Sequence, residues 1–146
     1  MQADLPSHDR VGDFQMNHDN QKALVERFWR LMEAREWLAA RALLAPDFVA
    51  DWPQMNERFP SPDAFMAMNE AHPAPNWHIV SVSVQTTEQG IVAEVLVTND
   101  GGADFAVGFY EVRDDLITRA REFWIERRIE PTPSWRAAWT EPITKS

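Results

Sequence analysis

The chain has 146 residues, a formal net charge of −9, no cysteine and seven tryptophans. The length suits one domain that buries its own core, and the lack of cysteine excludes disulfides, thiolate metal sites and a cysteine nucleophile. The acidic charge disfavours nucleic acid as a partner, while the many tryptophans suggest a pocket or an interface, where indole rings are common.

Polar residues fill the start of the chain. Residues 1–18 form an N-terminal extension without the apolar core of a secretory leader. No stretch approaches the roughly 18 apolar residues of a membrane span, so we expect no membrane partner and a cytoplasmic location. The rest divides into a main domain over residues 19–130 and a C-terminal docking tail over residues 131–146.

Helical periodicity follows the extension. The spacing predicts an amphipathic helix over residues 20–34 and a second helix over residues 36–45. The apolar stripe of the first helix consists of Leu24, Val25, Phe28, Leu31 and Met32. A short strand over Phe48–Trp52 comes next, and a third helix begins near Ser61 and ends before His72.

From residue 77 the apolar pattern has a period of two, which is typical of strands. The four predicted strands are Trp77–Thr87, Ile91–Asn99, Asp104–Val112 and Leu116–Glu126. Their short polar turns predict antiparallel neighbours. Helices followed by such a meander predict an α+β fold, with one sheet and helices on one of its faces.

Both faces of the last two strands carry apolar side chains. One face holds Phe105, Val107, Phe109, Ile117, Phe123 and Ile125, together with Arg119 and Arg121. The other face holds Ala106, Gly108, Tyr110, Val112, Leu116, Ala120, Glu122 and Trp124. Because a sheet with one solvated face alternates more cleanly, we expect the outer face to be buried in a homodimer. The alternative is a monomer with exposed aromatic side chains.

This order of elements resembles the nuclear transport factor two-like superfamily, and within it the chain is similar to the SnoaL-like polyketide cyclase group. The segments that carry the resemblance are Leu24–Trp29, Trp52–Gln54, Glu57–Phe59, Ile117–Trp124 and Pro133–Trp139. The resemblance implies a curved antiparallel sheet wrapped around the N-terminal helices, a cystatin-like α+β barrel with an internal pocket. It does not imply one reaction, because this fold carries isomerases, cyclases, hydrolases, dehydratases and binding proteins.

Ketosteroid isomerase-like members of the superfamily have three catalytic positions that can be matched to this chain. Their first-helix tyrosine corresponds to Phe28, which has no hydroxyl. Their aspartate base corresponds to Trp52, with Asp51 one residue earlier, and their second oxyanion donor corresponds to about Gly108. The resemblance therefore does not extend to that mechanism.

Limonene epoxide hydrolase-like members use an arginine–aspartate pair that corresponds to Leu96 and Thr98 and is absent here. Their other carboxylate corresponds to Glu122, and their polar residue before the proline corresponds to Asp51. The resemblance thus implies half of a hydrolase site.

Glu122 is the leading catalytic candidate, with Asp51 as its partner. A carboxylate beside Trp124 in a dry pocket has a raised pKa and is suited to general acid or base catalysis. The alternative is a salt bridge from Glu122 to Arg27 or Arg30 of the first helix.

Further residues are predicted to bind a ligand. Asp51 and Glu94 are expected to share the cavity with Glu122, which would divide acid and base roles, or else to lie exposed at strand ends. Other expected ligand-binding residues are Trp52, Trp124, Tyr110, Phe28, His78 and Asn56. His78 lies in phase with Val80, Val82 and Val84, so its alternative is a core or interface residue.

The four histidines are scattered and show no metal-ligand spacing, so we expect neither a metal nor an organic cofactor. These patterns predict a small-molecule-binding pocket protein that catalyses acid/base chemistry, such as isomerisation, cyclisation or hydration, on a small apolar molecule. The alternative is a non-catalytic ligand-binding or dimerisation module.

Overall fold

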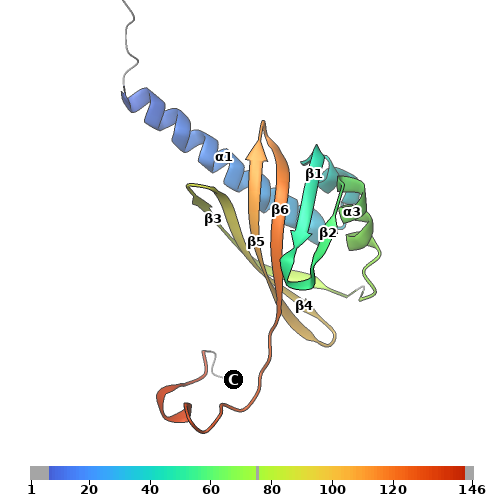
Figure 1. The fold of residues 1–146 in the computed structure, drawn as a ribbon, viewed down its shortest axis with the longest axis vertical. Helices are drawn as coiled ribbons and strands as arrows, with labels where there is room; N and C mark the ends of the chain where they lie inside the picture. The colour runs from blue at the N-terminus through green and yellow to red at the C-terminus, as the bar shows by residue number, and fades with distance from the viewer. Residues whose placement is uncertain (1–6, 75, 144–146) are drawn as a thin grey trace, which may run out of the picture.

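A six-stranded sheet curves around the C-terminal half of helix α1 (Ser7–Glu33) in this computed structural model, which describes residues 7–74 and 76–143 (Figure 1). In spatial order its strands are β2 (Glu57–Phe59), β1 (Leu44–Trp52), β6 (Leu116–Glu126), β5 (Gly102–Arg113), β4 (Gly90–Asn99) and β3 (His78–Thr87). The four long strands form the predicted antiparallel meander, and β1 joins β6 in parallel. The predicted α+β fold is confirmed, with a mixed sheet.

Two helix boundaries differ from the prediction. Helix α1 begins at Ser7 because no proline interrupts residues 7–33, so the helix continues through the polar extension. Helix α2 (Trp37–Arg41) ends four residues early because Leu44 already pairs with Ile117 of β6. Helix α3 (Pro62–Glu70) starts as expected, and its N-cap Ser61 accepts a hydrogen bond from the Ala64 N–H. Short 3-10 turns cover Pro53–Met55 and Ala137–Trp139.

The core lies between α1 and the inner face of the sheet. Three residues of the predicted stripe, Val25, Phe28 and Met32, are buried together with Trp29, while Leu24 and Leu31 are partly buried. Phe28 stacks on Phe65 of α3 with ring centroids 6.5 Å apart, and Phe65 in turn packs against Phe48 of β1 at 5.4 Å. These aromatic contacts fix α3 over the sheet beside the first helix.

Small side chains on β5 leave space inside the curved sheet. Ala106 of β5 lies opposite Trp124 of β6, and Gly108 lies opposite Glu122. The Tyr110 ring lies over Gly108, where a Cβ atom would come within 2.6 Å of two ring carbons. The tryptophan and the glutamate of β6 therefore extend over strand positions that have almost no side chain.

Irregular register moves three residues, His78, Val80 and Ile117, away from their predicted faces. A shift between Ile79 and Ser81 leaves His78 and Val80 exposed, while Val84 stays in the core. The prediction that His78 shares the apolar stripe is therefore wrong. A second shift, between Glu111 and Val112, turns Ile117 inward, although alternation placed it on the outer face. Each extra residue reverses the alternation beyond it.

The outer face of β5 and β6 is apolar, and an arginine side chain covers part of it. The Arg121 guanidinium lies 4.7 Å from the centroid of the Phe109 ring and 5.8 Å from that of Phe123, so it shields both rings from water. Phe109 is still 37% exposed and Ile125 50% exposed. The homodimer through this face stays a prediction.

The tail after β6 runs away from the sheet (Figure 1). Trp135 is 72% exposed and Trp139 is 80% exposed, so neither ring packs on the core. Docking of the tail onto a partner stays a prediction. In the part of the chain that the structure describes, no helix is long and apolar enough to cross a membrane.

Candidate functional site

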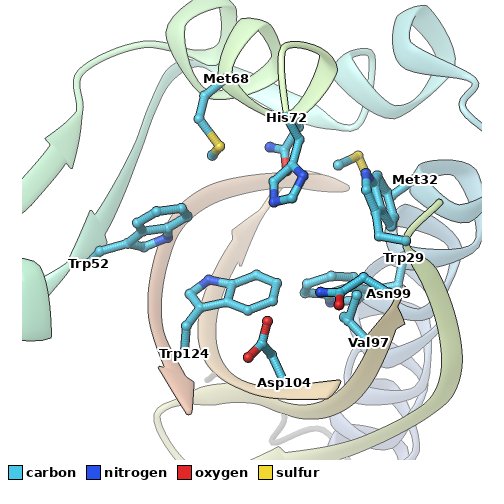
Figure 2. A pocket seen from close by; sticks show the side chains of 11 residues that line it. Trp29, Met32, Trp52, Met68, His72, Val97, Asn99, Asp104 and Trp124 are labelled. Carbon is cyan, nitrogen blue, oxygen red and sulfur yellow. The ribbon is translucent and has the colours of Figure 1, made fainter. Parts of the chain in front are cut away.

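A cavity of about 100 Å³ lies between α1, the end of α3 and the inner face of the sheet (Figure 2). This space is several times what a single water needs. Among the described residues, its lining is mainly apolar and aromatic. It consists of Trp29, Met32, Trp52, Met68, Asn69, His72, Trp77, Val97, Asn99, Asp104 and Trp124.

The end of α1 holds one wall of the cavity in place. Arg35 follows the helix in a left-handed conformation, with φ of 60°. Its guanidinium donates hydrogen bonds to the carbonyls of Met32 at 3.2 Å and Glu33 at 3.1 Å, and also to the Trp77 carbonyl. The same guanidinium lies 3.4 Å from the centroid of the Trp77 indole. One arginine therefore closes the helix and fixes a cavity tryptophan.

Asp104 and His72 are the titratable side chains among the described lining residues. Figure 2 shows them on opposite sides of the cavity, with Asp104 on β5 and His72 just beyond α3. His72 Nδ1 accepts a hydrogen bond from the Ala74 N–H at 3.1 Å, so in the neutral ring Nε2 carries the proton. The Asp104 carboxylate has no hydrogen bond or ion pair to another described residue. The cavity thus offers a free proton acceptor opposite an N–H donor.

Glu122 lies behind the lining rather than in it, and it is 2% exposed. Its Oε1 accepts a hydrogen bond from Trp52 Nε1 at 3.0 Å, and its Oε2 accepts one from the Tyr110 hydroxyl at 2.7 Å. In the described part of the chain no arginine forms an ion pair with it: Arg30 pairs with Glu26, and Arg27 is exposed. Burial raises the pKa of Glu122, although the donors from Tyr110, Trp52 and Trp124 oppose that rise.

Two further indole N–H groups, those of Trp29 and Trp124, are buried without a hydrogen-bond partner. The Trp124 N–H still lies near enough to Glu122 to lower its pKa, and the Trp29 N–H acts in the same way on Tyr110. Burial nevertheless raises the pKa of Tyr110 well above its usual value. The donors to the buried carboxyl group that the structure describes are therefore all neutral.

Asp51 is on the outer face of the sheet, so the expectation that it shares a cavity with Glu122 is wrong. Successive residues of a strand face opposite sides, and its neighbour Trp52 faces inward. Arg58 donates to Asp51 at 2.6 and 2.9 Å, and Arg119 donates at 3.0 Å. These hydrogen bonds, that of Arg58 first, lower the pKa of Asp51 to about 2. Arg119 of β6 therefore forms an ion pair with an acid of the neighbouring strand β1.

Glu94 also faces outward, in register with Ser83 and Val107, and is exposed. The expectation that it shares the cavity is wrong for the same reason of strand phase, because its neighbours Ala93 and Val95 are buried.

The other predicted ligand-binding residues divide into two groups. Trp52 and Trp124 line the cavity, with their ring centroids 6.1 Å apart and their planes at 60°. Tyr110 lies behind the lining with Glu122. Phe28, His78 and Asn56 do not line it: Phe28 is in the core, His78 Nδ1 lies 3.0 Å from Glu33 Oε1, and Asn56 caps a turn.

The sequence did contain a signal for Asp104. It is in phase with Ala106, Gly108 and Tyr110, the inner-face residues of the same strand. His72 follows a helix in a proline-rich loop, where no periodicity predicts the direction of a side chain. In the described part of the chain, no group of three or more histidine, aspartate or glutamate side chains is placed to hold a metal ion.

A family model described as a SnoaL-like domain matches residues 25–120. Among solved structures, the chain is similar to a candidate ketosteroid isomerase from Kribbella flavida, with 25% identity and a TM-score of 0.76 over 88% of this chain and 93% of that one.

It is also similar to an NTF-2 like protein of unknown function from Burkholderia xenovorans, with 18% identity and a TM-score of 0.73 over 88% of this chain and 99% of that one. A candidate polyketide cyclase from Xanthomonas campestris has 22% identity and a TM-score of 0.62 over 73% of this chain and 91% of that one. These two likenesses show the fold alone. No curated protein matches the sequence significantly.

Proposed function

This chain belongs to the SnoaL-like domain family, and from that premise we propose that it binds a small, largely apolar molecule in the cavity and catalyses proton transfer on it without a cofactor. Isomerisation, cyclisation and hydration are reactions of this type. A cytoplasmic location and a homodimer remain part of the proposal.

The observation that carries the proposal is the placement of Asp104 and His72 on opposite sides of one aromatic cavity (Figure 2). A carboxylate without a partner is suited to take a proton, and the His72 Nε2–H is suited to give one. The indole and methionine side chains around them form an apolar surface that suits an apolar body.

Glu122 has a different part in this proposal. Both of its oxygens already accept hydrogen bonds, and it does not line the cavity. It therefore acts as a positioning residue that orients the Trp52 indole of the cavity wall. Proton transfer to a bound molecule falls to the lining groups, because a general base must reach its proton directly or through one water.

A cavity-filling variant tests whether the cavity holds a molecule. Val97 of β4 lines the cavity, whereas its neighbour Leu96 faces outward. We expect native mass spectrometry of the protein from its own host to show a bound small molecule. Val97→Phe is expected to abolish that bound mass because the new ring fills the space, and the matched control Leu96→Phe is expected to keep it. A wild-type protein without bound mass, or a Val97→Phe variant that retains it, contradicts the proposal.

The recovered molecule then separates catalysis from simple binding. In deuterium oxide, the wild-type protein is expected to exchange a carbon-bound hydrogen of this molecule at least about 100-fold faster than Asp104→Asn. Glu94→Gln, which changes a carboxylate on the outer face, is expected to match the wild type. Equal exchange rates in all three proteins would instead support the non-catalytic ligand-binding module.

A further inference from the structure

The cavity is negative in charge. Among its described lining residues there is no lysine or arginine, and Asp104 has no cationic partner. Glu126 of β6 is the register partner of Asp104, so the two residues share the inner face. Glu122 lies further along that face of the same strand. Glu122 is buried with a raised pKa, and Glu126 is exposed, so Asp104 is the carboxylate that gives the described lining its negative charge.

Glu126 has only a weak partner of its own. It pairs with Arg128 at 3.5 Å, and both side chains are about two thirds exposed, at 69% and 68%. An exposed pair of this kind neutralises little charge at the cavity. A cationic group beside Asp104 would balance the charge of this carboxylate, which no described lysine or arginine of the lining compensates.

Aromatic rings surround the same space. Four indoles line it. Trp77 already carries the Arg35 guanidinium at 3.4 Å, while Trp52 and Trp124 meet at 60° to form a corner. Figure 2 shows Trp52, Trp124 and Trp29 around the opening, with the Asp104 carboxylate beside Trp124. Indole is the best aromatic partner for a cation, and cages of such rings recognise alkylated ammonium groups. Met32 and Met68 add soft, polarisable contacts for methyl groups.

We propose that the molecule bound in this cavity carries a small alkylated ammonium group, held between the indole rings with Asp104 as its charge partner. The proposal rests on the proposed function in that the cavity must be the ligand site. A metal ion fits this lining poorly, because hard cations need several oxygen ligands and Asp104 supplies the one carboxylate there. A quaternary ammonium has no N–H to satisfy, and it therefore suits a wall of rings and thioethers.

The two titratable lining groups keep the parts proposed above. The Asp104 carboxylate has two oxygens, so it can face the ammonium group and still accept a proton. The His72 Nε2–H remains the donor, because the Ala74 N–H engages Nδ1.

Choline and 3,3-dimethylbutan-1-ol form a matched pair of probes, because they have the same shape and differ in the charge. In calorimetric titrations at low ionic strength, we expect choline to bind the wild-type protein at least about tenfold more tightly than the neutral alcohol. Asp104→Asn is expected to bring the two affinities together. The outer-face control Glu94→Gln is expected to keep the wild-type ratio, which excludes an effect of net charge alone.

Three other outcomes of these titrations would contradict the ammonium proposal. If the alcohol binds as tightly as choline, the ligand needs no ammonium group and this proposal fails. The cavity can then still be the ligand site. If choline binds Val97→Phe as well as the wild type, it binds outside the cavity and the proposal fails. If neither probe binds at millimolar concentration, the proposal also fails, and retention of a bound mass in native spectrometry then decides the proposed function separately.

Discussion

Gly108→Ala is expected to lower the free energy of unfolding by about 3 kcal/mol. The new Cβ atom would come within 2.6 Å of two Tyr110 ring carbons and closer still to the hydroxyl. The ring has no easy escape, because it is 2% exposed and its hydroxyl holds Glu122 at 2.7 Å. Urea unfolding followed by far-UV circular dichroism measures the change.

Gly101→Ala is the matched control for this variant. Its nearest neighbour is a side-chain oxygen at 3.6 Å, so the methyl group meets no obstacle. We expect its unfolding free energy to stay within about 0.5 kcal/mol of wild type. A Gly108→Ala variant that is equally stable would show that Tyr110 does not lie over β5 as described.

Glu122→Gln is expected to change how stability depends on pH. Burial raises the pKa of Glu122 in the folded protein above the ordinary value of 4.5. The folded state therefore holds this proton at pH values where the unfolded state has lost it, and the wild-type protein loses stability as the pH rises from 4.5 through the raised pKa. The loss amounts to about 1.4 kcal/mol for each unit by which the pKa is raised.

The glutamine variant has no such proton, so its stability relative to wild type is expected to grow over that pH window. Urea unfolding at several pH values between 4 and 8 gives the two profiles. Glu94→Gln serves as the control, because this carboxylate is exposed and is expected to leave the wild-type profile unchanged. Parallel profiles for Glu122→Gln and wild type would mean that Glu122 titrates as an exposed carboxyl group does.

Simple alternation was enough to predict the inner face of the two central strands. Ala106, Gly108, Glu122 and Trp124 all lie where a period of two places them, because no bulge interrupts that part of β5 and β6. The same rule also places Asp104 on this face, although the inner-face residues named from the sequence began at Ala106.

The predictions that failed share a physical cause, which is the assignment of a strand residue to the wrong face of the sheet. Asp51 was expected to face inward with Trp52, but adjacent strand residues cannot share a face. His78 followed the apolar stripe in sequence, yet the register shift after Ile79 turned it outward toward Glu33. Bulges depend on pairing with other strands, and a local pattern does not reveal them.

The surplus of tryptophan has a structural explanation in large part. Four of the seven indoles line the cavity, and two of the others lie exposed in the tail at Trp135 and Trp139. The remaining one, Trp37, packs near Trp77 with ring centroids 6.5 Å apart. Each ring carries one N–H group. The indole N–H signals can therefore report separately on the cavity and on the tail.

Nuclear magnetic resonance of the seven indole N–H groups tests most directly whether the cavity is the ligand site. With the protein labelled with ¹⁵N and titrated with small amphiphilic compounds, we expect every binding compound to shift the signals of Trp29, Trp52, Trp77 and Trp124 together. The signals of Trp135 and Trp139 are expected to stay in place, since both rings are exposed in the tail. Shifts confined to the two tail signals, with the four cavity signals unmoved, would contradict a ligand site in this cavity.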